Sequence, residues 1–322
     1  MTVTIALAGD TMLGRSVAER LAAEEAPDAL FSPGLRAVAA EADLFVLNLE
    51  CCLSERGEPW PDPDKPFFFR AQPVAAEALA SLGVDCVTLA NNHALDFGVD
   101  ALLDTPAHLS RVGIATVGAG AGEEDARRPA TLEAAGVRVG VVGVTDHPRA
   151  YAAGRSRPGV AYADVASGVP RWLRDLVGGL SEEVDVVLVT PHWGPNMIAE
   201  PLPYVRSAAR ALTDAGADVV AGHSAHVFHG VAGRVVYDLG DFIDDYAVHP
   251  LLRNDLGLLF LVTVDRQGPV RLEAVPIALD FCHTRLAEGD ERAWIQDRFV
   301  TACAAFGTHV DARDGRLVVN WP

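Results

Sequence analysis

The stretch Val220-Ala221-Gly222-His223-Ser224-Ala225-His226-Val227-Phe228-His229-Gly230 places three histidines within seven residues, directly after an apolar run. The run at residues 217–221 predicts a buried strand, so the histidines fall at a strand's carboxyl end, where open α/β sheets hold their sites. An isolated histidine is more often a packing residue than a ligand. The spaced pair His223 and His226 predicts a metal site because polar residues end other predicted strands too, whereas His229 is interpreted as a packing residue.

Outward from this stretch, short β-branched runs alternate with longer segments of helical period. The short runs cover residues 3–8, 44–49, 86–90, 114–117, 130–132, 137–144, 184–190, 217–221 and 234–239, and the predicted helices cover residues 15–25, 35–42, 74–82, 99–112 and 205–215. This order predicts an α/β fold with a largely parallel sheet covered by helices. Runs at 258–265 and 270–277 have hairpin spacing and predict a second, partly antiparallel sheet. The tail predicts a helix over 288–306 that covers the site and an edge strand over 316–321.

Composition indicates an ordinary soluble globular protein. The chain has 322 residues, of which 50% are apolar and 22% charged, enough for one large core or two modest ones. No apolar run reaches the roughly 20 residues of a membrane span, and the first residues lack a signal peptide, so we expect a cytoplasmic protein without a membrane partner. The five cysteines show no paired spacing and predict reduced core residues.

The formal net charge of −18 restricts the partners. Such a surface repels polyanions, so nucleic acid, anionic membranes and long carboxylate polymers are disfavoured, and a neutral or basic ligand fits better. The alternative is that the charge serves solubility alone.

Polar residues end five of the predicted strands. Asp10 follows the first strand, Glu50 the second, and Asn92 and His93 the third, and two later strands end at His192 and His223. Asp10 alone could be a helix cap, but histidine and glutamate cap poorly. A mixed cluster of carboxylates and imidazoles suits Mn, Fe or Zn, singly or as a pair, and no organic cofactor is indicated.

Several motifs recur at or near the predicted strand ends. They are Gly9-Asp10-Thr11-Met12-Leu13-Gly14-Arg15, Asn48-Leu49-Glu50, Lys65-Pro66 with Phe69-Arg70, Asn91-Asn92-His93-Ala94-Leu95-Asp96-Phe97-Gly98, His192-Trp193-Gly194, Gly222-His223 with His226, and Tyr237-Asp238-Leu239-Gly240-Asp241-Phe242. Together these motifs resemble the CapA family, which is similar to the calcineurin-like metallophosphoesterases and is associated with poly-γ-glutamate capsule synthesis. The resemblance spans about residues 1–285 and implies a four-layered α/β/β/α sandwich. Residues 286–322 are expected to add a helix and an edge strand to the same domain.

The resemblance also implies roles for individual residues. The implied metal ligands are Asp10, Glu50, Asn92, His192, His223 and His226, and His93 takes the position of the general acid. The phosphoesterase pattern has a histidine where this chain has Met12, so one ligand is missing and a second metal is not expected to bind firmly. Asp241 stands where the family usually has asparagine and adds negative charge beside the site, which opposes a phosphate or polyglutamate substrate.

Two chemistries fit these residues. In a metallohydrolase, activated water attacks an amide, such as a γ-glutamyl bond, or a phosphoester while His93 protonates the leaving group. In a peptide epimerase, as in a family member from lasso-peptide biosynthesis, two groups exchange a proton at a peptide α-carbon, and Asp10 and His283 are the predicted pair. We favour epimerisation of a peptide, such as a ribosomally made precursor. A non-catalytic capsule-synthesis-type binding protein is the third alternative.

Five residues are predicted to contact the substrate. Arg15, Lys65 and Arg70 could orient a carboxylate, or could instead pair with the abundant acids. Trp193 could belong to an aromatic wall, although core packing is its alternative use, and Asp241 lies in the acidic rim.

Overall fold

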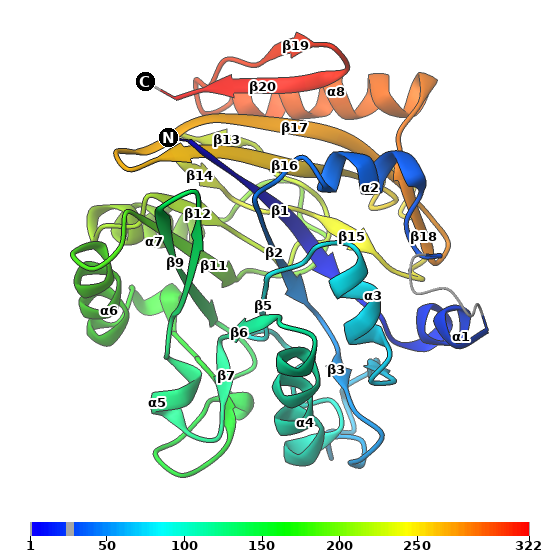
Figure 1. Cartoon of the computed structure of the whole chain (residues 1–322), viewed down its shortest axis with the longest axis vertical. Coiled ribbons are helices and arrows are strands. Elements are labelled where there is room, and N and C mark those ends of the chain that lie inside the picture. The colour runs from blue at the N-terminus through cyan, green and yellow to red at the C-terminus, as the bar shows by residue number, and fades with distance from the viewer. Residues whose placement is uncertain (1, 24–28, 322) are drawn as a thin grey trace.

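The computed structural model, which describes residues 2–23 and 29–321, is built on two large β-sheets that pack face to face (Figure 1). The first sheet has the order β19-β20-β17-β16-β1-β2-β5-β6, with β15 beside β1 and β18 beside β17. Its strands are β1 (Val3–Thr11), β2 (Leu44–Leu49), β5 (Cys86–Thr88), β6 (Ala115–Val117), β15 (Asp241–Ile243), β16 (Leu256–Asp265), β17 (Gly268–Asp280), β18 (His283–Leu286), β19 (Asp311–Arg313) and β20 (Arg316–Asn320).

The second sheet has the order β13-β14-β12-β11-β9-β8. Its strands are β8 (Ala130–Ala134), β9 (Val137–Thr145), β11 (Val186–His192), β12 (Val219–Ala221), β13 (Val231–Ala232) and β14 (Val235–Val236). Two small pairs complete the strands, β3 (Cys52–Leu53) with β4 (Arg70–Ala71) and β7 (Ala119–Gly120) with β10 (Gly159–Val160). Because β12, β11 and β9 run parallel, their carboxyl ends meet at one edge.

Strand alternation produces the layers. In β1, Ile5 and Leu7 lie in the core between the sheets, whereas Ala6 and Ala8 face a second core under helices. That second core is covered by α1 (Arg15–Ala23), α2 (Pro33–Ala39), α3 (Ala75–Ser81) and α4 (Gly98–Arg111). A third core lies under α6 (Arg171–Ser181) and α7 (Pro203–Asp214), with the short α5 (Glu123–Ala126) at its margin. The predicted four-layered α/β/β/α sandwich is therefore confirmed, and Figure 1 shows the helices on its two outer sides.

The hairpin formed by β16 and β17 was predicted to belong to the second sheet, and this is wrong. β16 pairs antiparallel with β1 and so extends the first sheet. Its apolar residues point both ways, Phe260 into the core between the sheets and Leu259 towards the helices, which suits an interior strand. The second sheet gains its antiparallel character from the β8–β9 and β13–β14 pairs instead.

The chain termini also differ from expectation. The predicted helix at 15–25 is described to Ala23, and its last two predicted residues lie outside the described residues. α8 (Gly289–Ala304) packs Ile295 and Phe299 into the core between the sheets, so it closes that core rather than covering the strand ends. β20 pairs with β17 on one side and β19 on the other, which makes β19 the edge strand.

No helix of the described residues has the length and apolarity to cross a bilayer. All five cysteines are buried and unbonded, as predicted.

Gly9 fixes the close approach of β1 to the segment before β15, and its substitution gives a first testable prediction. A Cβ atom there would lie 1.8 Å from the carbonyl oxygen of Gly240, which accepts a 2.8 Å hydrogen bond from Asp10 N. Gly9→Ala is expected to lower the free energy of unfolding by roughly 1–3 kcal/mol, measured by urea denaturation. Gly179→Ala in α6 meets no atom within 4 Å and should stabilise by about 0.5–1 kcal/mol. Equal midpoints for the two variants would contradict this account.

Candidate metal centre

Buried polar side chains from both sheets converge where their strands end. Asp10 lies inside β1, which extends to Thr11 because Asp10 and Thr11 pair with Asp241 and Ile243 of β15. Glu50 follows β2, His192 ends β11, and His223 follows β12. All four side chains are at most 1% exposed.

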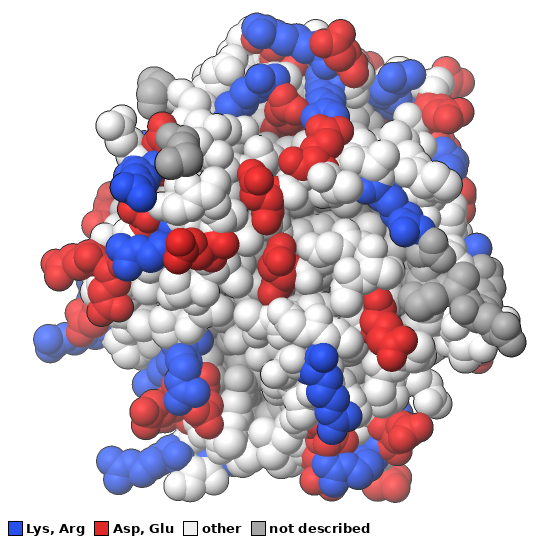
Figure 2. Space-filling model, viewed as in Figure 1, with Lys and Arg blue, Asp and Glu red and all other residues white. Residues whose placement is uncertain are grey.

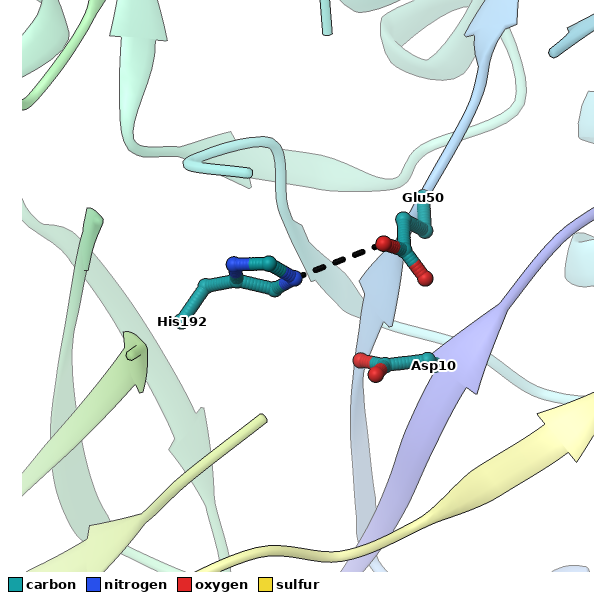
Figure 3. Close-up of side chains that lie close together, drawn as sticks. All are labelled: Asp10, Glu50 and His192. Carbon is teal, nitrogen blue, oxygen red and sulfur yellow. Dashed lines mark ion pairs between the residues drawn. The ribbon is translucent and has the colours of Figure 1, made fainter. Parts of the chain in front are cut away.

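Two overlapping groups could each hold a cation. Asp10, Glu50 and His192 form the first group, whose ligand atoms lie within 4.8 Å of one another, and Figure 3 shows all three side chains pointing to one place. Oε1 of Glu50 is 3.4 Å from Nε2 of His192. The second group joins Asp10 to His226 and Asp241, with Nδ1 of His226 2.7 Å from Oδ1 of Asp241. Asp10 is shared, so it is positioned to bridge two sites.

Several of these donors have no hydrogen-bond partner among the described residues. They are both oxygens of Glu50, both ring nitrogens of His192, Nδ1 of His223 and Oδ1 of Asn92. Buried polar atoms are almost always satisfied, so a cluster of orphaned ones indicates a missing ligand. Mixed carboxylate, imidazole and amide donors fit a divalent cation such as Mn, Fe or Zn.

Met12 stands where a further histidine would be expected, and it contributes no ligand. Its sulfur accepts a 3.0 Å hydrogen bond from Gly14 N, and its side chain is buried. Asp241, which was assigned to the substrate, instead supplies a carboxylate beside Asp10 and His226. The second donor group therefore exists without the missing histidine.

The electrostatics of the centre favour binding of a cation. Burial, with the neighbouring Asp10, raises the pKa of Glu50 well above its usual range. Burial also raises the pKa of Asp10, but the nearby imidazoles outweigh this and hold it well below normal, above all His223, whose Nδ1 lies 3.3 Å from Oδ1 of Asp10. Burial, with the neighbouring His147, lowers the pKa of His192 well below its usual range, so its nitrogens are free to coordinate. A cation would relieve the crowding of carboxylates.

His93 forms a dyad with Asp96 beside the centre. Its Nδ1 donates to Oδ2 of Asp96 across 2.7 Å, and its Nε2 lies 3.9 Å from Oε1 of Glu50. Burial lowers the pKa of His93 to about 4, although Asp96 opposes the shift. His93 is therefore a neutral imidazole at pH 7, with Nε2 open to the centre and able to take a proton.

Lys65 is paired with this dyad, so its ammonium is not free to bind a substrate. Its ammonium lies 2.9 Å from Oδ1 of Asp96 and donates to the backbone oxygen of Asn92 across the same distance. It thereby fixes both the partner of His93 and the peptide that carries a predicted ligand. The sequence motif at residues 91–98 contains Asp96, but the sequence did not reveal that Asp96 pairs with Lys65.

Arg15 does line a cavity next to the centre. This active-site pocket encloses about 490 Å³ and is bordered by Arg15, Phe67, Phe69, His93, Asn196, Met197, His226, Tyr246, Ala247, Val248, His249, Pro250 and Asn254. Arg15 is the single lysine or arginine among these lining residues, and its guanidinium is paired with Asp245. The pocket therefore presents mainly apolar surface and no unpaired cation.

Two residues predicted to contact the substrate, Trp193 and Arg70, are not among the residues that line this pocket. Trp193 is 3% exposed, donates from Nε1 to the carbonyl of Tyr237 and packs in the core under α6 and α7. Arg70 donates to the carbonyls of Arg56 and Gly57 and stacks on Phe97, 4.0 Å from its ring centroid. The core packing of Trp193 and the loop contacts of Arg70 depend on residues distant in the sequence, so the neighbouring sequence does not reveal them.

His283 lies outside both donor groups. It lies in β18, opposite Asp280 of β17, and it belongs to neither of the two donor groups that contain Asp10. Its predicted role as the partner of Asp10 gains no support from this geometry.

Sequence reasoning missed three residues that shape the centre. Asn48 donates to Oδ1 of Asp10, and the backbone N–H of Ser224 donates to Oδ2. Asp238 accepts from the backbone of Ala225 and Gly240 and so holds the loop in which Ser224 and His226 adopt positive φ angles of 107° and 58°. A polar residue inside an apolar strand, as Asn48 is, was the available signal.

The sequence profile described as "Bacterial capsule synthesis protein PGA_cap" matches residues 4–246. The chain belongs to this capsule synthesis family. Within it, the chain is 33% identical to a probable polyglutamine synthesis accessory protein of Mycobacterium tuberculosis, over 86% of this chain and 76% of that one. It is 29% identical to the PGA biosynthesis protein CapA of Bacillus subtilis, over 84% and 70% of the two chains.

Family membership agrees with a phosphoesterase-like architecture. A solved structure of a phosphatase from Mycoplasma pneumoniae superposes with a TM-score of 0.50 at 11% identity, covering 86% of this chain and 94% of that one. At this identity the likeness concerns the fold alone. The donor groups of the present structure are by themselves compatible with a divalent metal.

His229, three residues after His226, is a buried packing residue whose pKa is lowered by its surroundings. Its Nε2 donates to the carbonyl of Ile198 across 2.9 Å, and the side chain is buried. Burial lowers its pKa to about 4, and Arg298 and Arg206 add to the shift. Because the folded pKa lies below the unfolded value, the unfolded chain binds more protons between about pH 6.5 and pH 4. Stability contributed by neutral His229 is thus present above this window and is lost as the pH falls.

This sign can be tested with His229→Gln. Between pH 7 and pH 4 the wild type should lose roughly 3 kcal/mol more unfolding free energy than the variant, measured by urea denaturation at each pH. His309→Gln, at a side chain that is 87% exposed, is the control and should follow the wild type. A parallel loss in wild type and His229→Gln would contradict the assignment.

Proposed function

We propose that this protein is a metal-dependent hydrolase that cleaves an amide bond in a peptide-like chain. The observation that carries the proposal is the set of buried, unpartnered donors around Asp10 and Glu50 beside a neutral His93–Asp96 dyad. The residues that would hold the metal are Asp10, Glu50, Asn92, His192, His223 and His226, with Asp241 as a further carboxylate. A bound divalent cation supplies Lewis-acid chemistry, by which water is activated and the scissile group polarised.

The chain's own residues supply the proton transfers. Nε2 of neutral His93 takes a proton from the attacking water while the new C–O bond forms. The imidazolium that results is stabilised by Asp96, to which Nδ1 already donates. His93 then passes the proton to the leaving amine as the C–N bond breaks. Lys65 keeps Asp96 and the backbone of Asn92 in place throughout.

The surroundings support a neutral or apolar substrate segment. Arg15 in the active-site pocket is already paired, so a phosphate or a run of glutamates finds no free cation among the residues described there. On the face drawn in Figure 2, acidic and basic side chains are interspersed without a continuous basic area among the described residues. The relatives' names refer to polyglutamine synthesis and PGA biosynthesis. Polyglutamine is a chain of residues joined by amide bonds, so these names support an amide substrate.

Epimerisation at a peptide α-carbon, in a cytoplasmic, lasso-type biosynthetic setting, is the second candidate. The lack of a free cation for phosphate favours a peptide ligand equally for this reaction. It requires an acid/base group opposite Asp10, and the geometry offers His93 more readily than His283.

One experiment separates these reactions. Synthetic peptides, including any precursor peptide encoded near the gene, are incubated with the Mn-loaded protein in ¹⁸O-water and, separately, in deuterated water, and analysed by mass spectrometry. Cleavage that adds ¹⁸O to the new carboxyl group and stops with a chelator supports the amidohydrolase. Uptake of one deuterium without cleavage would overturn it in favour of epimerisation, and cleavage of a phosphodiester but of no peptide would overturn the amide substrate. Binding without any turnover would leave the non-catalytic alternative.

A further inference from the structure

A second pocket lies between α7 and α8, outside the candidate metal centre. It encloses about 450 Å³ and is lined by Ala199, Glu200, Pro201, Arg206, Gly230, Trp294, Asp297, Arg298, Thr301, Ala302, Ala305 and Phe306. None of these residues belongs to the donor groups around Asp10. The volume suits a small ligand or one to two amino-acid residues.

Arg298 is the unusual member of this pocket. Its guanidinium carbon lies 5.4 Å from the ring centroids of both Phe228 and Trp294, and it has no hydrogen bond or ion pair within residues 2–23 and 29–321. Burial lowers the pKa of this guanidinium, which marks incomplete solvation of a charge that the protein does not neutralise. Other half-buried arginines, such as Arg285 and Arg316, are paired with carboxylates. The five donors of Arg298 are therefore available to a ligand.

The other charges in the pocket define the ligand's charge. Arg206 is committed in part, since its Nε donates to the carbonyl of Pro201 and its terminal nitrogen lies 3.6 Å from Glu200. Glu200 and Asp297 balance the two arginines, so the pocket has no excess of positive charge to hold a multiply charged anion. A single planar carboxylate matches the bidentate geometry of one guanidinium.

The uncharged residues that line the pocket indicate which uncharged part of a ligand would fit. Trp294 and Phe306 contribute aromatic rings, and Pro201, Ala302 and Ala305 contribute aliphatic surface. Burying an apolar group against them gains free energy that a bare inorganic anion cannot gain. We propose that this pocket is a second binding site, which takes a monocarboxylate with an apolar body through Arg298. A peptide's free carboxyl terminus after an apolar residue and a small aromatic acid share this chemistry.

The position of this site connects it to the active-site pocket. Asn196 and Met197 line the active-site pocket, and Glu200 and Pro201 line the second one. Between them, the carbonyl of Ile198 accepts the hydrogen bond from His229. The segment 196–201 thus contributes to both pockets, and a ligand at Arg298 contacts the segment that borders the candidate centre.

The test is calorimetric titration of the full chain with matched probes, which needs no catalytic activity. N-acetylphenylalanine should bind, whereas N-acetylphenylalaninamide and inorganic phosphate should bind roughly 10–100-fold more weakly. Arg298→Gln should weaken the acid by the same factor, and Arg292→Gln, an exposed arginine of the same helix, should not. Ala305→Trp fills the pocket from an exposed position and should also abolish binding while Arg298 remains. Thermal melting of each variant checks folding.

Several outcomes would overturn the site. They are equal binding of acid and amide, equal binding of acid and phosphate, unchanged affinity for the acid in Arg298→Gln, or no binding of the acid at concentrations up to about 10 mM. A tripeptide that ends in a free phenylalanine carboxylate is compared with N-acetylphenylalanine. Tighter binding of the tripeptide identifies a peptide terminus as the ligand, and tighter binding of the small acid identifies a free metabolite-like acid; either result supports the site. Because the probes test binding alone, failure here leaves the hydrolase proposal unaffected.

Discussion

Glu50→Gln is expected to weaken manganese binding by at least about 100-fold while leaving the metal-free fold as stable as the wild type or more so. Both oxygens of Glu50 are buried without partners, and burial beside Asp10 raises the pKa of its carboxyl group. Removing the charge therefore relieves repulsion in the metal-free protein, whereas a bound cation loses a ligand. The two effects have opposite signs, which a purely structural role of Glu50 would not produce.

The measurement is a pair of thermal melts, with chelator and with added manganese, alongside metal analysis of the purified protein. The wild type should gain melting temperature on adding manganese, because a ligand that binds only the folded state stabilises it. Glu50→Gln should not gain. Glu133→Gln, an exposed glutamate of β8, is the matched control. An unchanged manganese response in Glu50→Gln would remove the candidate centre from consideration.

His93→Gln is expected to lower kcat by roughly 10²–10³-fold without reducing metal content. The imidazole is the proposed proton carrier, and its Nε2 lies 3.9 Å from Glu50 while Nδ1 is held by Asp96. Asp96→Asn should lower kcat less, because the imidazole remains but its tautomer is no longer fixed. His309→Gln serves as the exposed control. Full activity of His93→Gln with metal bound would contradict the proposed proton path.

The pH profile provides an independent check on His93. Neutral His93 is required to take a proton from water, and its pKa is lowered to about 4. Activity should therefore persist at pH 5 and fall only as the pH drops through about 4, when the imidazole becomes protonated before reaction. Loss of activity already near pH 6.5 would indicate a solvent-exposed histidine instead.

The residues that end the strands could be read from the chain because strand and helix periods are local properties. Asp10, Glu50, His192 and His223 each stand at the end of a short β-branched run, and parallel strands bring their carboxyl ends to one edge. The α/β class followed from the same alternation, whereas the four-layered arrangement was implied by the family resemblance. The partners of the arginines and aromatic residues did not follow, since Arg15 meets Asp245 and Trp193 meets Tyr237 across long sequence separations.

The sequence by itself thus determined the α/β class, the set of strand-end donors and the excess of negative charge. Only the tertiary structure decided that Asp241 stands beside Asp10, that the hairpin of β16 and β17 extends the first sheet, and that Lys65 is bound to Asp96. The physical reason is that periodicity depends on neighbours along the chain. Pairing register and burial of charge depend instead on which strands meet. Groups more than 200 residues apart, such as the Asp10 carboxylate and the backbone N–H of Ser224, meet only after the sheets have packed.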